Sequence, residues 1–312
     1  MALNSAHMNH QVGRHAVGQN RSMVLTIFLN LLITIAELIG GIVSGSLALI
    51  SDALHNAGDT LAILLSFAAI RMGSKKADAR RTFGYKRVEI LAALLNSSLL
   101  IAISVFLIIK AVDRLMDPAP IEGALMMTVA LIGLAANLAG VVLLKPHARG
   151  NINIKAAWLH LMGDTVSSIA VVIGGAAIIW FGVMWIDPVI TLGIAIFLIR
   201  ESWTIVAQTT NILLQGAPVH VPNTELVEEM LSVEGVADVH HIHLWNLDDQ
   251  TIHLEAHIRL KHDILLSAAD EIRLRTEAKI RNRFHIQHIT LQSEFQTCHS
   301  CDHHAFNPKH HL

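Results

Sequence analysis

The sequence has little charge, few aromatic residues and almost no cysteine. Only 15% of its 312 residues are Asp, Glu, Lys or Arg and 5% are aromatic, whereas 53% are hydrophobic. Soluble domains carry about 25% charged residues, so this composition excludes an ordinary soluble protein and predicts one that is embedded in a lipid bilayer. Two cysteines exclude a disulfide framework. A formal net charge of -2 gives no reason to expect a nucleic-acid partner.

Six long apolar runs follow a polar N-terminal segment. Residues 1–22 contain no apolar stretch followed by a small-residue cleavage site, so we interpret them as an N-terminal tail and not a signal peptide. Each run reaches the ~18 residues that a membrane-spanning helix needs. We therefore expect a transmembrane domain of six helices over residues 23–207, with spans at Met23–Val43, Leu47–Ile70, Val88–Val112, Ile121–Leu144, Ala156–Phe181 and Trp185–Ala207.

Basic residues gather in two of the loops between these runs. The loop after the second run and the loop after the fourth are basic, whereas Ser44-Gly45-Ser46 and the Gly182–Met184 turn carry no charge. Because loops rich in Lys and Arg stay in the cytosol, both termini and both basic loops are predicted to be cytosolic. The compact size and the absence of a targeting extension favour a bacterial inner membrane, with an organelle membrane as the alternative. The basic residues are Arg71, Lys75, Lys76, Arg80, Arg81, Lys86, Arg87, Lys145, Arg149 and Lys155.

The second and fifth runs each contain the pattern His-x-x-x-Asp. His55 and Asp59 are four residues apart, and so are His160 and Asp164. On a helix, this spacing places both side chains on one face. Ionisable residues at bilayer depth are costly and usually functional, and two imidazoles with two carboxylates suit tetrahedral Zn²⁺. The repeat therefore predicts a metal site between the two helices; a proton relay without metal is the alternative.

The heights of these residues in the membrane do not match perfectly. At about 1.5 Å per residue, Asp59 lies about 18 Å from Arg71 and Asp164 about 14 Å from Lys155. The two carboxylates are thus expected near one level, with the two histidines on opposite sides of it. Helix tilt or a longer fifth helix has to absorb the offset.

Other polar residues also lie inside the predicted spans. Asn30, Asn96 and Asn137 are interpreted as groups that hydrogen-bond between helices. Glu37 and Asp52 are the two members of this set for which a part in transport chemistry is the strongest alternative.

The pattern changes to that of a soluble domain from residue 208 onward. Predicted helices at Thr224–Leu231 and Ala268–Phe284 alternate with predicted strands at Val236–Leu247, Thr251–Leu260 and Ile286–Phe295. The order αββαβ predicts a small α+β domain over residues 208–296, with one sheet covered by helices on one face. The fold class is therefore an α-helical membrane protein with a cytosolic α+β domain.

This domain is rich in side chains that bind metals. His240, His241 and His243 share one predicted strand, whereas His253, Glu255 and His257 line one face of the next. A hydrated sheet face could also hold such residues without metal. Residues 297–312 form a tail in which Cys298-x-x-Cys301, followed by Asp302, His303 and His304, resembles half of a zinc knuckle.

Together these motifs resemble the cation diffusion facilitator family of zinc-exporting metal/proton antiporters. The likeness covers nearly the whole chain and includes the Ser51–Asp59 stretch, the His160–Asp164 repeat, Phe83-Gly84-Tyr85, and Val239–Trp245 in the cytosolic domain. One departure is the segment from Pro146 to Lys155, which is short and holds only His147, whereas many relatives have a long histidine-rich loop there.

The resemblance implies roles for particular residues. It gives the transport site to His55, Asp59, His160 and Asp164. It also implies a homodimer held partly by a metallochaperone-like cytosolic domain that binds further Zn²⁺, with His240, His257 and Glu294 at its ligand positions and Cys298 and Cys301 in a tail motif of some members.

A mechanism can be argued from the ligand types alone. Zn²⁺ binds neutral imidazole and ionised carboxylate, so loading the site expels protons and unloading takes them back. The protein is thus predicted to be a proton-coupled Zn²⁺ exporter and not an enzyme; Co²⁺ and Ni²⁺ suit the same ligands. A membrane-anchored zinc sensor and a proton-coupled carrier of another solute are the alternatives. An intramembrane metallopeptidase is excluded because no His-Glu-x-x-His segment exists.

Overall fold

The computed structural model describes residues 30–296 apart from 74, 76 and 146–151. Five of the described helices are long and apolar enough to cross a membrane, and a shorter apolar helix, Asn30–Ser44, precedes them. The beginning of the predicted first span, from Met23, lies outside the described residues. The predicted helical membrane architecture is confirmed. The five helices are α2 (Leu47–Gly73), α3 (Arg87–Met116), α4 (Gly123–Leu144), α5 (Ile152–Phe181) and α6 (Ile186–Leu213).

The chain divides into two compact units. Of the described residues, those up to Leu65 together with Leu95–Ile205 form the first, and Ser66–Leu94 together with those from Val206 onward form the second. The second unit thus includes the C-terminal end of α2 and the N-terminal end of α3 as well as the predicted soluble domain.

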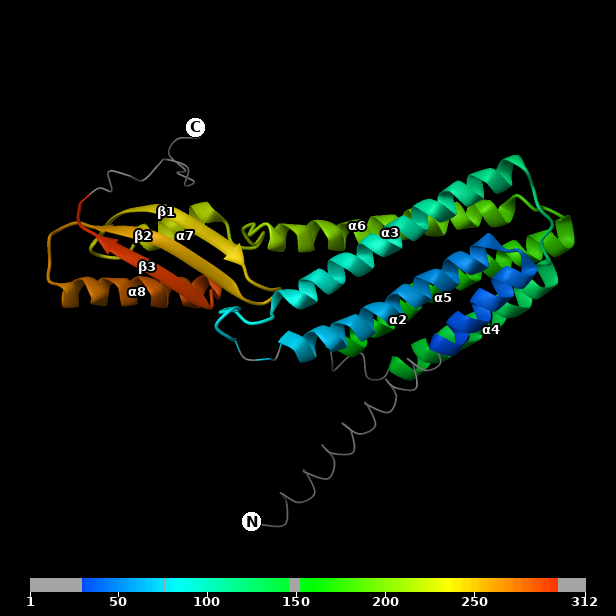
Figure 1. Cartoon of the computed structure of the whole chain (residues 1–312), viewed down its shortest axis with the longest axis horizontal. Coiled ribbons are helices and arrows are strands. Elements are labelled where there is room, and N and C mark those ends of the chain that lie inside the picture. The colour runs from blue at the N-terminus through cyan, green and yellow to red at the C-terminus, as the bar shows by residue number, and fades with distance from the viewer. Residues whose placement is uncertain (1–29, 74, 76, 146–151, 297–312) are drawn as a thin grey trace, which may run out of the picture. The chain divides into compact units, whose positions relative to one another are not determined.

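In the first unit, α4 and α5 lie side by side (Figure 1) and approach closely through glycines. A Cβ atom at Gly123 would lie 2.8 Å from the Ile178 side chain, and one at Gly175 would lie 2.9 Å from the Met127 side chain. Small residues let the backbones of membrane helices come together in this way, where no water is expelled to drive association. A side chain at these glycines would push the two helices apart.

The start of α2 is fixed by a buried carboxylate from α6. Asp187, which is fully buried, accepts hydrogen bonds from the Ser46 hydroxyl at 2.5 Å and from the backbone N–H groups of Leu47 at 2.9 Å and Ala48 at 3.1 Å. The Ser46 hydroxyl oxygen in turn accepts from the Leu49 N–H. The first N–H groups of a helix have no partner within the helix, and a negative charge there also complements the helix dipole. Asp187 therefore anchors the helix that carries His55 and Asp59.

The second unit contains the predicted αββαβ arrangement. Its elements are α7 (Asn223–Leu231), β1 (Val236–Asn246), β2 (Ile252–Leu260), α8 (Leu266–Phe284) and β3 (His288–Glu294). The strands form one sheet in the order β1-β2-β3, with β1 antiparallel and β3 parallel to β2 (Figure 1). The predicted boundaries agree with these to within two residues.

Alternate residues of β2 form the hydrophobic core of this unit, as the period-two pattern predicts. Leu254, Ala256 and Ile258 are fully buried and pack with residues of both helices, among them Leu226 and Ile280. The opposite face of β2 carries His253, Glu255 and His257.

The helices α7 and α8 are joined by ion pairs at their surface. Arg283 pairs with Glu225 at 3.1 Å and also with Glu229, and Lys279 lies 3.0 Å from Glu229. These pairs are exposed, so they add little to stability. They indicate that the two helices cover the sheet together.

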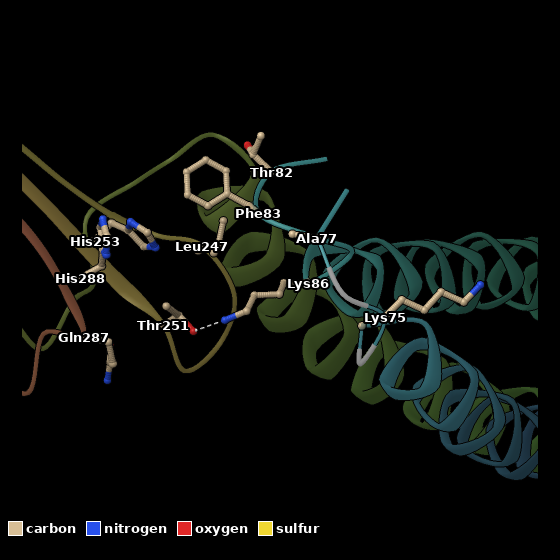
Figure 2. A pocket seen from close by; sticks show the side chains of 12 residues that line it. Lys75, Ala77, Thr82, Phe83, Lys86, Leu247, Thr251, His253, Gln287 and His288 are labelled. Atoms are coloured by element: carbon tan, nitrogen blue, oxygen red, sulfur yellow. Dashed lines mark hydrogen bonds between the residues drawn. The ribbon is translucent and has the colours of Figure 1, made fainter. Parts of the chain in front are cut away.

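Residues between α2 and α3 contribute to a pocket of about 460 Å³ in the second unit (Figure 2). Lys86 donates a hydrogen bond from Nζ to the Thr251 hydroxyl at 3.1 Å and lies 3.3 Å from the Asp248 carboxylate. His253 and His288 also line the pocket. Lys86 thereby connects the loop before α3 to the turn between β1 and β2.

His253 is enclosed by aromatic rings and is only 5% exposed. It stacks on Trp245 with ring centroids 5.3 Å apart, meets the edge of Phe83 at 5.5 Å and lies 4.6 Å from His288. Burial lowers the pKa of His253, and the nearby His288 and Lys86 lower it further. The folded state thus favours the neutral imidazole.

Replacement of Asp187 by alanine should destabilise the protein. The substitution leaves the hydroxyl of Ser46 and the N–H groups of Leu47 and Ala48 buried without this acceptor, and a buried donor without a partner costs about 1–3 kcal/mol. We expect a lower thermal unfolding midpoint for Asp187→Ala in detergent. Asp187→Asn keeps one acceptor oxygen and should lose less. Equal midpoints for Asp187→Ala and wild type would contradict the role of Asp187 as an anchor.

Acidification should destabilise the folded state through His253. Because its folded pKa is lowered, the unfolded chain binds more protons below about pH 6.5, and stability falls as the pH drops through that value. We expect the unfolding midpoint of His253→Phe to fall less between pH 7.5 and pH 5.5 than that of wild type. The exposed His262→Phe serves as the control. An identical pH dependence of His253→Phe and wild type would contradict this assignment.

Candidate metal centre

The structure brings His55, Asp59, His160 and Asp164 into one cluster between α2 and α5. His55 Nε2 lies 3.5 Å from Asp164 Oδ1, and His160 Nε2 lies 3.2 Å from Asp59 Oδ2. Within each helix, the four-residue spacing brings His55 Nδ1 to 3.5 Å from Asp59 Oδ2 and His160 Nε2 to 3.5 Å from Asp164 Oδ2. Each histidine thus contacts both carboxylates.

The two carboxylates come together, as the estimated heights led us to expect: ligand atoms of Asp59 and Asp164 lie within 4.8 Å of each other and of one from His55. The contacts between the helices join His55 to Asp164 and His160 to Asp59. Helix α5 begins at Ile152, whereas the height of Asp164 was estimated from Lys155. The fifth helix is therefore longer than that estimate assumed.

Burial differs across this cluster. The Asp164 side chain is 2% exposed and that of His55 is 9% exposed, whereas the His160 side chain is 43% exposed. One ligand atom each from His55, Asp59 and Asp164 lies within 4.8 Å of the others. The cluster therefore has a buried side formed by His55 and Asp164, and His160 lies at its more open side.

Several ligand atoms of the cluster have no hydrogen-bond partner. These buried atoms are His55 Nδ1, Asp59 Oδ2 and both carboxylate oxygens of Asp164. Buried polar atoms normally have partners, and groups without one call for an explanation. Two imidazoles and two carboxylates are the donor set that suits Zn²⁺, so the chemistry of these atoms fits a divalent metal ion.

Polar residues from neighbouring helices surround the cluster. The Asn56 amide donates a hydrogen bond to Glu37, and the Ser167 hydroxyl donates one to Asp52. Asn96, on α3, donates to the backbone carbonyl of Gly58. As predicted, Asn96 forms a hydrogen bond between two helices. The sequence did not indicate the roles of Asp187 and Ser167 as hydrogen-bonding residues. Asp187 follows the predicted turn by only a few residues and was assigned to the last predicted span.

A second group of ligand types lies on the sheet of the second unit. His240 and His257 are direct partners across β1 and β2, with ring centroids 5.5 Å apart. Glu294, at the end of β3, places one carboxylate oxygen 3.2 Å from His240 Nε2 and the other 2.7 Å from His257 Nδ1. His240 Nε2, His257 Nδ1 and Glu294 Oε2 are buried without a hydrogen-bond partner. The three side chains could hold a metal ion.

The remaining histidines of the sheet do not all converge on this group. An irregularity in β1 between His240 and His243 gives His241 a positive φ of 53°, and the ring of His241 lies 4.7 Å from that of His257. His253 lies instead in the aromatic cage formed with Trp245 and Phe83. His253, Glu255 and His257 therefore lie on one face of β2, as predicted, but they do not form a single metal site.

The predicted cysteine ligands lie outside the described residues. Cys298 and Cys301 both follow residue 296, as do the histidines of the C-terminal tail. Their role as metal ligands stays a prediction.

The sequence matches two family models that together cover most of the chain. The model described as the cation efflux transmembrane domain matches residues 23–214. The model described as the cytoplasmic domain of cation efflux proteins matches residues 220–296. The first includes all four residues of the cluster between α2 and α5, and the second includes His240, His257 and Glu294.

Relatives similar over nearly their full length come from several bacteria. The metal cation efflux system protein CzcD of Cupriavidus metallidurans is 33% identical over 288 residues, which cover 92% of this chain and 90% of the relative. The zinc transporter ZitB of Escherichia coli is 34% identical over 275 residues, 86% of each chain. The cadmium, cobalt and zinc/H(+)-K(+) antiporter of Bacillus velezensis is 33% identical over 285 residues, 90% of each chain. The chain therefore belongs to the cation efflux family, also called the cation diffusion facilitators, and is a multi-pass membrane transporter of divalent metal ions.

Proposed function

We propose that the protein exports Zn²⁺ from the cytosol in exchange for protons, and that His55, Asp59, His160 and Asp164 bind the transported ion. The observation that supports this most strongly is the convergence of two histidines and two aspartates from α2 and α5, with buried ligand atoms that lack partners. Charged groups inside a membrane span are costly, and those that occur there usually serve a function such as ion transport.

The contacts within the cluster explain how protons and metal can compete. When protonated, each imidazole can pair with the carboxylates that lie 3.2–3.5 Å away. When a metal ion arrives, the histidines must be neutral and the carboxylates ionised, so that protons are released. The same four groups are thus satisfied either by protons or by Zn²⁺. If the site is exposed to one side of the membrane at a time, the protein exchanges Zn²⁺ for protons and acts as an antiporter.

The ligand types favour Zn²⁺ over other metals. Two nitrogen and two oxygen ligands suit tetrahedral Zn²⁺, whereas an all-oxygen set would suit Mn²⁺ and thiolates would suit softer ions. Co²⁺ accepts the same ligands. The names of the relatives include zinc, cobalt and cadmium, so the range of exported ions extends to metals other than Zn²⁺.

The loops and the relatives suggest an orientation in a bacterial cell membrane. Loops rich in Lys and Arg follow the second and fourth spans, which puts both termini in the cytosol. Trp180 and Trp185 are 74% and 57% exposed, as expected for an aromatic belt at the opposite interface.

The cytosolic domain is proposed to make a homodimer and to bind regulatory Zn²⁺. His240, His257 and Glu294 would hold this ion, because their buried ligand atoms lack other partners. When bound, the ion would tie β1, β2 and β3 together. The sheet would then report the cytosolic metal concentration to the transporter.

Replacement of Asp164 by asparagine should abolish transport. The amide has nearly the same shape but lacks the negative charge that a divalent ion needs, so we expect Zn²⁺ flux into proteoliposomes to fall by more than about tenfold, a loss of at least ~1.4 kcal/mol. Asp113→Asn, at a carboxylate that is 58% exposed, is the control and should transport normally. Unchanged Zn²⁺ flux in Asp164→Asn would remove this residue from the proposed site. Zinc binding by the wild type without any flux would instead favour a membrane-anchored sensor.

Replacement of Glu294 by glutamine should remove one bound Zn²⁺ per chain and leave the transport site intact. Glu255→Gln is the matched control, because Glu255 is exposed on the same face of β2, two residues from His257. We expect equilibrium dialysis with metal analysis to show fewer zinc ions on Glu294→Gln than on wild type, and no change for Glu255→Gln. An equal zinc content in all three proteins would contradict the cytosolic site.

A further inference from the structure

A side-chain hydrogen bond joins α2 to α5 one turn away from the metal cluster. The Ser167 hydroxyl of α5 donates to Asp52 Oδ1 of α2 at 2.5 Å, and Asp52 is fully buried. Asp52 precedes His55 by three residues, and Ser167 follows Asp164 by three residues. The bond thus lies directly beside the contact between His55 and Asp164.

The side-chain contacts between α2 and α5 form a regular series, which we call the α2–α5 seam. Each step forward along α2, first of three residues and then of four, matches an equal step backward along α5. Steps of three and four residues follow one face of a helix. The two helices are therefore antiparallel and hold one register along the seam. Its pairs are, in order, Asp52 with Ser167, His55 with Asp164, and Asp59 with His160.

The hydrogen bond lies at the buried end of the seam. Asp59 and His160, at the other end, are partly exposed, whereas Asp52 is buried. Four residues beyond Asp52 and Ser167 on their helices, Ala48 and Val171 are fully buried members of one hydrophobic cluster. At this end the hydrogen bond is shielded from competing water, which strengthens it.

A different register would bring like groups together. Moving α5 by four residues in one direction would place His160 opposite His55. Moving it by four residues in the other direction would place Asp164 opposite Asp59. Apolar side chains pack without a preferred direction, whereas a hydrogen bond tolerates only a narrow range of distances and angles. The bond between Ser167 and Asp52 therefore favours the observed register over its neighbours.

We propose that Ser167 and Asp52 are positioning residues, which set the register of α2 against α5 and so bring His55 and Asp164 to one metal ion. The inference rests on the proposed function and adds to it two residues that do not bind the ion. Register matters because Zn²⁺ holds its ligand atoms at about 2.0–2.2 Å. Groups that orient metal ligands commonly contribute about 10–100-fold to metal affinity.

This role requires a hydroxyl at position 167 and an acceptor oxygen at position 52, but no charge at position 52. Ser167→Thr retains the hydroxyl, and Asp52→Asn retains an acceptor oxygen. Ser167→Ala and Asp52→Ala each remove one partner of the hydrogen bond. The four variants thus separate the loss of the bond from the loss of the negative charge.

The test measures initial rates of Zn²⁺ uptake into proteoliposomes over a range of Zn²⁺ concentrations. We expect Ser167→Ala and Asp52→Ala to raise the KM for Zn²⁺ by about tenfold or more. Ser167→Thr and Asp52→Asn should stay close to wild type. The double variant Ser167→Ala/Asp52→Ala should be no worse than the more affected single variant, because both substitutions remove the same bond.

Thr165→Ala is the matched control on α5. The Thr165 hydroxyl donates to the Leu161 carbonyl of its own helix at 2.7 Å and does not join α5 to α2. This variant should retain the wild-type KM. Thermal unfolding midpoints of all variants in detergent show that each is folded, and the two positions give independent tests if one variant does not fold.

Three results would overturn the proposal. The first is a wild-type KM in Ser167→Ala. The second is an Asp52→Asn variant as impaired as Asp52→Ala, because the charge of Asp52 and not its hydrogen bond would then matter. The third is an equal rise of KM in Thr165→Ala and Ser167→Ala, which would assign the effect to the loss of any hydroxyl on α5.

Failure of the proposed function would look different. In that case the wild type would not transport Zn²⁺, or Asp164→Asn would transport it normally. If the wild type transports Zn²⁺ and Asp164→Asn is inactive while Ser167→Ala has the wild-type KM, the inference about Ser167 and Asp52 alone is wrong.

Discussion

The structure depends on ionisable groups that are buried between apolar helices, where each needs another such group, a proton or an ion to offset its charge. A histidine or an aspartate alone in such a place would be expensive, because lipid offers neither water nor counter-ions. His55, Asp59, His160 and Asp164 meet this constraint by contacting one another across α2 and α5. A cluster that can be satisfied either by protons or by a divalent cation is suited to exchange one for the other.

The surrounding helices hold this cluster in place. Asp187 fixes the start of α2 from α6, and glycines allow α4 to pack closely on α5. The two helices that carry the four residues of the cluster are therefore each braced by a neighbour. Such support matters because a metal site requires its ligands to be held in position by the groups around them.

Periodicity alone predicted most of the fold and the grouping of His55 with Asp59 and of His160 with Asp164, whereas the set of His240, His257 and Glu294 came from the resemblance to the family. Long apolar runs identify the spanning helices, alternation identifies β2, and the four-residue spacing places His55 with Asp59 on one face. The register between helices could not be predicted, because it depends on where α5 begins and how it packs. The sequence therefore left open how the offset between the two histidines is absorbed, whereas in the structure each histidine lies 3.2–3.5 Å from both carboxylates. The hydrogen bonds of Asp187 were missed for the same reason, since a carboxylate that caps a distant helix leaves no local signal.

In the proposed transport site, one divalent ion is held by side chains from both α2 and α5. Anomalous diffraction from crystals grown with Zn²⁺, measured at the zinc absorption edge, would locate this ion. We expect a peak at about 2.0–2.2 Å from a nitrogen of His55 and His160 and from an oxygen of Asp59 and Asp164. Crystals that show zinc only on His240, His257 and Glu294, with no peak between α2 and α5 at saturating metal, would contradict it.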